Sequence, residues 1–193
     1  ALVNDQIRRI RELLRDMDSE PKITFGRFTG ETEEEYEKAK IKYEEVEDVE
    51  KDPLMENELI SREQMRRTPP NILITNYAML EYMLLRPGDN IIFSRENAEK
   101  WQYIVFDEAH SYVGAKGIEV ATMIKRVKAM LNRNDIKFIL TSATLGDEKS
   151  NDEIIHFGEQ LCNAYFDASC IVRSYPEIVK PEREVKKDRK SVV

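Results

Sequence analysis

The chain alternates short apolar runs with longer segments in which apolar residues recur every three or four positions. Runs of the first kind predict strands over residues 22–28, 71–75, 101–109 and 136–144, with 169–173 as a further candidate. Segments of the second kind predict helices over residues 1–17, 32–50, 61–67, 77–86, 95–100, 117–132 and 152–166. Strands that are almost continuously apolar and are each followed by a helix are typical of a parallel sheet covered on both faces. The pattern therefore predicts an α/β fold with a mostly parallel sheet flanked by helices.

Two of the predicted helices carry signals for their first turn. Ser61 followed by Gln64 is the pattern of a capping box, in which each side chain binds a backbone amide of the other residue. Ser150 followed by Glu153 predicts a similar start for the helix over residues 152–166. That helix is expected to turn one apolar face inward through Ile154, Phe157, Leu161 and Tyr165.

The composition favours a soluble protein of a reducing compartment, and we expect a cytoplasmic location. The 193 residues carry a net charge of −7 and are 41% hydrophobic and 35% charged. No apolar run approaches the roughly 20 residues that span a membrane. The two cysteines, Cys162 and Cys170, form neither a metal-ligand pattern nor a disulfide framework.

Residues 1–175 are predicted to form one domain. Within it, residues from about 31 to 68 form an acidic, helical insertion with the Glu and Lys spacing of an exposed helix. This insertion is either solvated surface or a segment that faces another protein. Residues 176–193 are polar and contain proline, and are predicted to be a tail or linker.

Polar side chains follow several of the predicted strands at the point where each strand ends. Asp107 and Glu108 come directly after one apolar run, and Thr29, Thr75 and Thr141 stand at or just after the ends of others. In parallel α/β sheets, ligands bind outside the carboxyl ends of the strands. We therefore expect these side chains to meet at one edge of the sheet.

Two adjacent carboxylates at a strand end need a chemical reason, because a carboxylate near a core is costly unless it is paired or holds a metal. Asp107 could hold Mg²⁺, which takes few protein carboxylates and keeps several of its waters. Glu108 could then orient and deprotonate an attacking water, as phosphoryl transfer requires. The alternative is that the two acids simply begin a loop.

The stretches "IVFDEAH" and "TSATL" resemble the hydrolysis and coupling motifs of the DEAD/DEAH-box helicases of superfamily 2. "ALVNDQIRRI", "FTGET" and "ITNYAML" resemble that family's nucleic-acid-contacting motifs, in the expected order, so that the resemblance covers residues 1 to about 166. It implies an incomplete RecA-like domain of the P-loop NTPase class. "TNYAMLEYMLLRP" and "GIEVATMIKRVKAML" are also similar to large bacterial helicases of DNA repair and phage defence, which favours DNA over RNA.

The resemblance implies a role for each matching residue, with ATP and Mg²⁺ as cofactors. Asp107 would coordinate Mg²⁺ directly or through water, together with Glu108, and Glu108 would activate water. The residues that would couple the nucleotide state to strand movement are His110, Ser142, Ala143 and Thr144. Without the motif, His110 would be taken for a loop histidine bound to backbone, and the two hydroxyls for ordinary strand-end groups.

The resemblance also implies a set of nucleic-acid contacts to the phosphate backbone. These are Asn4, Gln6, Arg8, Thr29, Gly30, Thr75 and Asn76. For the arginines of the first helix the alternative is a solvated helix face, and for "TGET" it is a turn with a helix cap.

No G-x-x-x-x-G-K-[ST] phosphate loop occurs in the sequence, and "VGAKGIE" has the wrong spacing and position. We therefore expect the chain to be a helicase fragment that alone neither hydrolyses nor tightly binds ATP, and whose unpaired sheet edges promote self-association. The alternative function is a non-catalytic nucleic-acid-binding or scaffolding module derived from a helicase domain. A metal-dependent nuclease would need further acidic ligands at the strand ends.

Overall fold

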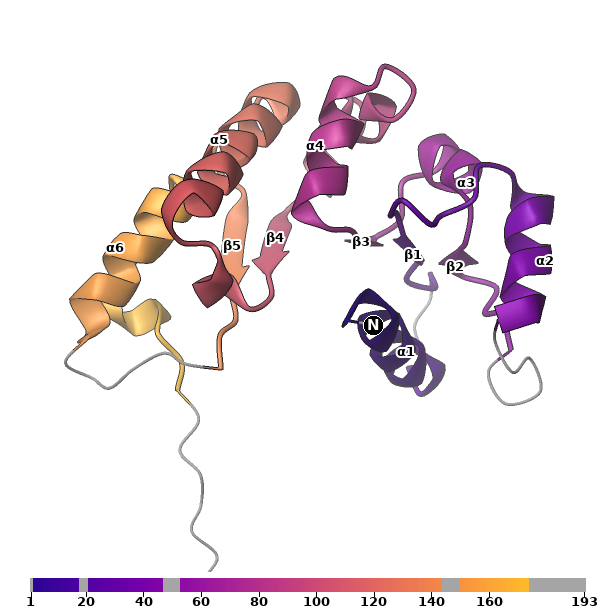
Figure 1. The fold of residues 1–193 in the computed structure, drawn as a ribbon, viewed down its shortest axis with the longest axis horizontal. Helices are drawn as coiled ribbons and strands as arrows, with labels where there is room; N and C mark the ends of the chain where they lie inside the picture. Colours follow the sequence, from indigo (N-terminus) through magenta and orange to yellow (C-terminus); the bar gives the residue numbers. More distant parts are fainter. Residues whose placement is uncertain (1, 18–20, 47–52, 144–149, 174–193) are drawn as a thin grey trace, which may run out of the picture.

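The computed structural model describes residues 2–17, 21–46, 53–143 and 150–173 (Figure 1). The predicted tail over 176–193, the domain boundary at 175 and Thr144 lie outside these ranges. Within them, no helix is both long enough and apolar enough to cross a lipid bilayer.

The strands form two parallel sheets, which confirms the predicted fold class. β1 (Phe25–Arg27) lies between β2 (Glu58–Leu59) and β3 (Ile72–Ile74), and β4 (Tyr103–Phe106) pairs with β5 (Lys137–Leu140). β2 was not predicted, because two residues are too few for a hydrophobic period. It lies within the predicted insertion, so that segment is not helical throughout.

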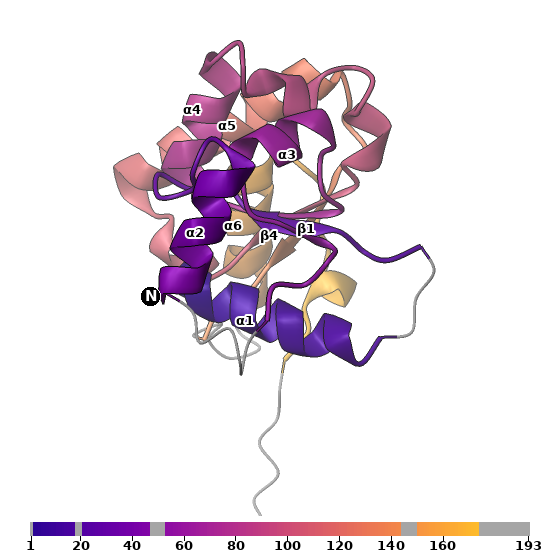
Figure 2. The same ribbon diagram turned by 90° about the vertical axis from the view of Figure 1, so that its right-hand side faces the viewer.

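Helices lie on both sides of the sheet formed by β1, β2 and β3. The helices of the chain are α1 (Leu2–Arg15), α2 (Tyr36–Val46), α3 (Arg62–Arg67), α4 (Tyr77–Leu85), α5 (Gly114–Leu131) and α6 (Asn151–Cys162). Figures 1 and 2 show α3, α4 and α5 on one side of the strands and α1 on the other. Single 3₁₀ turns occur at η1 (Asn90–Phe93), η2 (Ala98–Lys100), η3 (Ala109–Ser111) and η5 (Ala168–Cys170). The candidate strand over 169–173 was therefore wrong.

One of the two predicted helix starts is confirmed. At α3 the Ser61 side chain accepts from the Gln64 amide and the Gln64 side chain accepts from the Ser61 amide. At α6 the backbone of Ser150 has φ −95° and ψ 10°, and its side chain makes no capping hydrogen bond. An N-cap residue needs an extended backbone to aim its hydroxyl at the first turn, so the predicted cap was wrong.

Successive residues of β4 and β5 point to opposite faces of their sheet. Ile104, Phe106, Phe138 and Leu140 pack into the main core with α4, α5 and α6. On the other face Tyr103, Val105 and Ile139 are 53%, 57% and 47% exposed. This face, which also carries Lys137 beside the Tyr103 ring, is therefore largely apolar and uncovered by the described residues.

A buried ion pair joins α1 to β2. Arg11 donates from Nε and Nη2 to the two carboxylate oxygens of Glu58, each at 2.8 Å. Both side chains are 5% exposed. The Arg11 guanidinium also lies 5.1 Å from the ring centroid of Tyr43 on α2. Helix α1 is thus anchored to the insertion by a desolvated bidentate contact.

Candidate functional site

Asp107, Glu108, Thr141 and Ser142 meet where β4 and β5 end. The two strands pair in register up to Phe106 and Leu140. Their ladder continues beyond the strands, because the Thr141 amide donates to the Phe106 carbonyl at 2.9 Å and the Ala109 amide donates to the Thr141 carbonyl at 2.8 Å. The polar residues after each strand are therefore held side by side by backbone hydrogen bonds.

The Asp107 carboxylate lies at the exposed rim and is oriented through both oxygens. Oδ1 accepts from Thr141 Oγ1 at 2.6 Å and from the Glu108 amide at 3.2 Å. Oδ2 accepts from Gln6 Nε2 on α1 at 2.9 Å. The structure thus brings a predicted nucleic-acid contact, Gln6, against the predicted metal ligand.

Glu108 adopts a left-handed backbone conformation, with φ 50° and ψ 47°. This conformation is unfavourable for a residue with a Cβ. Glu108 Oε2 is shielded from solvent and has no hydrogen-bond partner. It lies 3.2 Å from His110 Nδ1, which in turn lies 3.1 Å from Ser142 Oγ. His110 therefore links the predicted general base to the end of β5.

Tyr112 packs beside the site, and no sequence pattern had pointed to it. Its ring packs edge-on against Phe106 and Tyr77, with centroid distances of 5.6 and 6.3 Å. Lys116 Nζ lies 4.8 Å from the Tyr112 centroid and 5.3 Å from that of Tyr77. Burial, and then the charge of Asp107, raise the pKa of the Tyr112 hydroxyl.

The donor set at this edge fits a magnesium nucleotide. Two carboxylates and the Thr141 hydroxyl supply oxygen ligands, which Mg²⁺ prefers while keeping several waters. The Glu108 side chain is 47% exposed, so its carboxylate is accessible to a water molecule, while Oε2 itself is shielded beside His110. Among the described residues no group of three or more His, Cys, Asp or Glu side chains could hold a metal.

The predicted nucleic-acid contacts after β1 and β3 share a second rim. The Phe28 amide donates to the Ile74 carbonyl at 2.8 Å, which holds Thr29 beside Thr75 and Asn76. Asn76 is the N-cap of α4, and its Oδ1 accepts from the Met79 amide at 2.8 Å. The Asn76 side-chain oxygen is therefore already used in capping α4.

The remaining predicted residues contribute less to the observed site. Arg8 is exposed on α1 and Ala143 is exposed after β5. The side chain of Asn4 lies outside the described part of the chain, as does Thr144.

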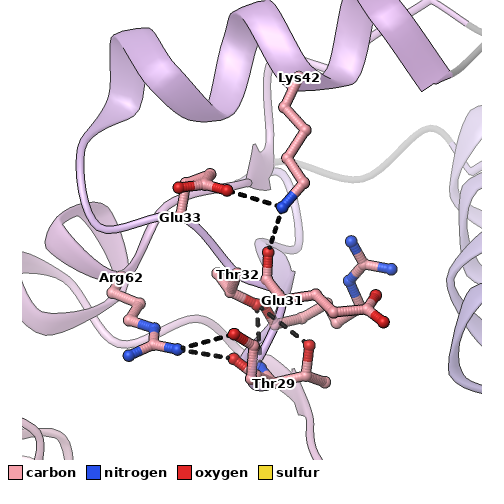
Figure 3. Close-up of polar contacts among 8 residues, drawn as sticks. Thr29, Glu31, Thr32, Glu33, Lys42 and Arg62 are labelled. Atoms are coloured by element: carbon pink, nitrogen blue, oxygen red, sulfur yellow. Dashed lines mark hydrogen bonds and ion pairs between the residues drawn. The ribbon is translucent and has the colours of Figure 1, made fainter.

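The turn over residues 29–32 is held by two cations that the sequence did not point to. Arg62 Nη2 donates to the Thr29 carbonyl at 2.9 Å, and Lys42 Nζ donates to the Glu31 carbonyl at 2.8 Å (Figure 3). These contacts span 33 and 11 residues of sequence, so no local pattern could have indicated them.

The comparisons with known proteins agree on a helicase-type protein. The family model described as DEAD/DEAH box helicase matches residues 1–152. The Druantia protein DruE of Escherichia coli (strain UMEA 4076-1) is 46% identical over 101 residues, which are 47% of this chain and 5% of DruE. The uncharacterized ATP-dependent helicase YprA of Bacillus subtilis (strain 168) is 37% identical over 100 residues, which are 51% of this chain and 12% of YprA.

A solved structure has a similar fold. The crystal structure of the DUF1998 helicase MrfA bound to DNA matches 85% of this chain and 17% of its own, with a TM-score of 0.56 and 26% identity. The chain thus spans only a small part of the relatives that it matches. Because the family model covers well over half of its residues, the chain belongs to the DEAD/DEAH box helicase family.

Proposed function

We propose that the chain is part of the first motor domain of an ATP-dependent helicase or translocase that acts on nucleic acid, with DNA favoured. The observation that carries the proposal is the Asp107 carboxylate, oriented at the sheet edge by Thr141 and Gln6, beside the shielded oxygen of Glu108. Similarity to a helicase structure solved with DNA bound supports DNA as the substrate.

Each residue of the rim has a distinct part in the proposed reaction. ATP with Mg²⁺, when bound, supplies the phosphoryl group and the cation that neutralises charge on the phosphates. Asp107 would hold that cation directly or through water. Thr141 and Gln6 hold the Asp107 carboxylate in position, so the carboxylate need not be ordered during the reaction.

Glu108 is proposed as the general base. Its side chain is 47% exposed at the rim, so its carboxylate can accept the proton of an attacking water. His110 contacts both Glu108 and Ser142, and so would report the state of the base to the end of β5. Ala143 and Thr144 follow Ser142 and are proposed to extend this coupling toward the rest of the motor.

Nucleic acid is proposed to run along the second rim. Thr29, Gly30, Thr75 and Asn76 offer backbone amides and small polar groups at strand ends, which suit phosphate contacts that do not depend on base sequence. Asn4, Gln6 and Arg8 on α1 would add contacts from the other side of the strands.

Residues 1–175 are proposed as one domain that works only within a longer protein. The 193 residues contain no G-x-x-x-x-G-K-[ST] loop to cradle phosphates, so this chain alone should neither hydrolyse nor tightly bind ATP. The unpaired sheet edges would promote its self-association in isolation, and the exposed face of β4 and β5 would add to this tendency.

The test compares ATPase activity and strand unwinding of the longer protein with those of its Glu108→Gln variant. We expect the variant to bind nucleic acid normally and to lose roughly 10²–10⁴-fold of the hydrolysis rate. Undiminished hydrolysis would contradict the role of Glu108. Absence of hydrolysis in the unmodified longer protein, with retained nucleic-acid binding, would favour the non-catalytic module instead.

A further inference from the structure

We infer that Arg62 and Lys42, both within the acidic segment 31–68, are positioning residues that hold the 29–32 turn in the form that binds a nucleic-acid phosphate. This inference rests on the proposed function, which places nucleic acid against Thr29 and Gly30. It assigns two cations of the acidic segment the task of supporting that turn.

The carbonyl groups of the turn are tied back to the segment. Arg62 Nη2 lies 2.9 Å from the Thr29 carbonyl oxygen and 3.4 Å from that of Gly30. Lys42 Nζ lies 2.8 Å from the Glu31 carbonyl oxygen. Figure 3 shows both cations reaching the turn from separate elements, Lys42 from α2 and Arg62 from α3.

The amides of the turn are divided into two groups. The Thr29 amide donates to Thr32 Oγ1 at 2.9 Å, and the Thr32 amide donates to the Thr29 carbonyl at 3.2 Å. The amides of Gly30 and Glu31 have no acceptor within the described part of the chain, and both residues are exposed. A Cβ added at Gly30 would meet nothing within 4 Å. Two adjacent N–H groups are therefore available beside open space.

This division favours an anion. Carbonyl oxygens carry partial negative charge, and here two cations bind and neutralise them. The N–H groups that remain carry partial positive charge, and successive free amides in a turn form an anion-binding concavity. Because backbone amides read phosphate and not base identity, the expected ligand is the sugar-phosphate backbone.

Arg62 is itself fixed in place. Its guanidinium lies 5.2 Å from the ring centroid of Phe28, which is fully buried. Its Nε is shielded from solvent without a hydrogen-bond partner, a cost that the contacts to the turn must offset. The Arg62 amide donates to the Glu33 carbonyl at 2.9 Å, and the Ser61–Gln64 capping box fixes the start of α3.

Lys42 is held by a second acceptor within the segment. Its Nζ donates to Glu33 Oε1 at 2.6 Å, and this hydrogen bond and the charge of Lys42 lower the pKa of the Glu33 carboxyl. Glu33 thus orients Lys42, and Lys42 in turn holds the Glu31 carbonyl of the turn. The charge of Glu33 is thus paired with Lys42 within the segment.

The test measures binding of a fluorescein-labelled single-stranded DNA oligonucleotide to the 193-residue chain by fluorescence anisotropy. Arg62→Met and Lys42→Met should each weaken binding roughly five- to tenfold, the equivalent of about one net hydrogen bond. Arg62→Lys and Lys42→Arg, which can still donate to the carbonyls, should restore most of it. The matched controls are Arg67→Met on α3 and Lys40→Met on α2, which remove the same charges from exposed positions of the same helices. They should leave affinity within about twofold.

Amide hydrogen exchange of Gly30 and Glu31 separates positioning from folding. In the unmodified chain, added DNA should protect these two amides, and in Lys42→Met it should not, at an unchanged Tm. Lys42 is the safer variant, because its side chain is 45% exposed and its loss leaves the core intact.

Each outcome decides something. If the unmodified chain does not bind the oligonucleotide, the proposed nucleic-acid site fails and the inference falls with it. If it binds and the Arg62 and Lys42 variants bind equally well, the inference alone is overturned. Equal losses in the Arg67 and Lys40 controls would overturn it as well, since net charge and not position would then explain the effect.

Discussion

The Arg11–Glu58 pair is expected to make a large contribution to the stability of the domain. Its geometry is bidentate, with both contacts at 2.8 Å, and both side chains are 5% exposed. Replacing Arg11 leaves the Glu58 charge buried and unpaired, which typically costs about 3–5 kcal/mol. A cavity of about 150 Å³ borders both residues, so water can reach the remaining charge.

We therefore expect Arg11→Met to cost about 3 kcal/mol, the lower end of that range. In a chain of this size each kcal/mol shifts Tm by roughly 2–4 °C, so Tm should fall by roughly 6–12 °C. The assay is thermal unfolding followed by circular dichroism, with urea unfolding as a second measure. The double variant Arg11→Met with Glu58→Leu should lose less than either single variant, because no buried charge remains.

The matched control is Lys38→Met, which removes a contact of the same 2.8 Å length to Glu35. Those side chains are 63% and 58% exposed, and solvent screens such a pair. No resolvable change in Tm is expected. The reasoning is refuted if Arg11→Met is as stable as Lys38→Met, or if the losses at Arg11 and Glu58 simply add in the double variant.

Three further predictions test other features. Glu108→Gly should be more stable than Glu108→Ala by about 1 kcal/mol in urea unfolding, because φ is 50° and glycine adopts it without strain; equal stability would show that the left-handed backbone is not strained. Burial raises the pKa of the Cys162 thiol to about 12, so iodoacetamide at pH 8 should alkylate exposed Cys170 and spare Cys162 by mass spectrometry, and equal labelling would contradict this. Val105→Lys should reduce self-association in sedimentation velocity, while Val46→Lys, equally a change at an exposed valine, should not; a strictly monomeric unmodified chain would refute the role of the β4–β5 face.

The sequence indicated features that depend on local order. The apolar run before Asp107 forms a parallel strand, as predicted, and Ser61 and Gln64 form the predicted capping box. Both features depend on residues that are only a few positions apart. The predicted helix over 152–166 ends early, at Cys162, since Asn163 takes a left-handed conformation with φ 48°. Tyr165, expected inside, is 82% exposed as a result.

Features that depend on distant residues were not predictable in the same way. Gln6 and Asp107 are 101 positions apart, and their contact follows from how α1 lies against the strand ends. The hold of Arg62 and Lys42 on the 29–32 turn depends on the path of an insertion whose acidic composition suggested only an exposed helix. Composition describes which surface a segment can present to water, but not which backbone groups its cations reach.

The hydrogen bond from Gln6 to Asp107 has a consequence for how the two proposed ligands affect each other. One side chain of α1 touches the carboxylate assigned to the cation, and the same helix carries residues assigned to nucleic acid. A bound nucleic-acid strand that displaced α1 would therefore change the free energy of cation binding at Asp107. Because thermodynamic coupling is reciprocal, cation binding at that site would change the affinity for nucleic acid by the same factor. Movement along the nucleic acid and turnover of the nucleotide would then be coupled through the side-chain amide of Gln6.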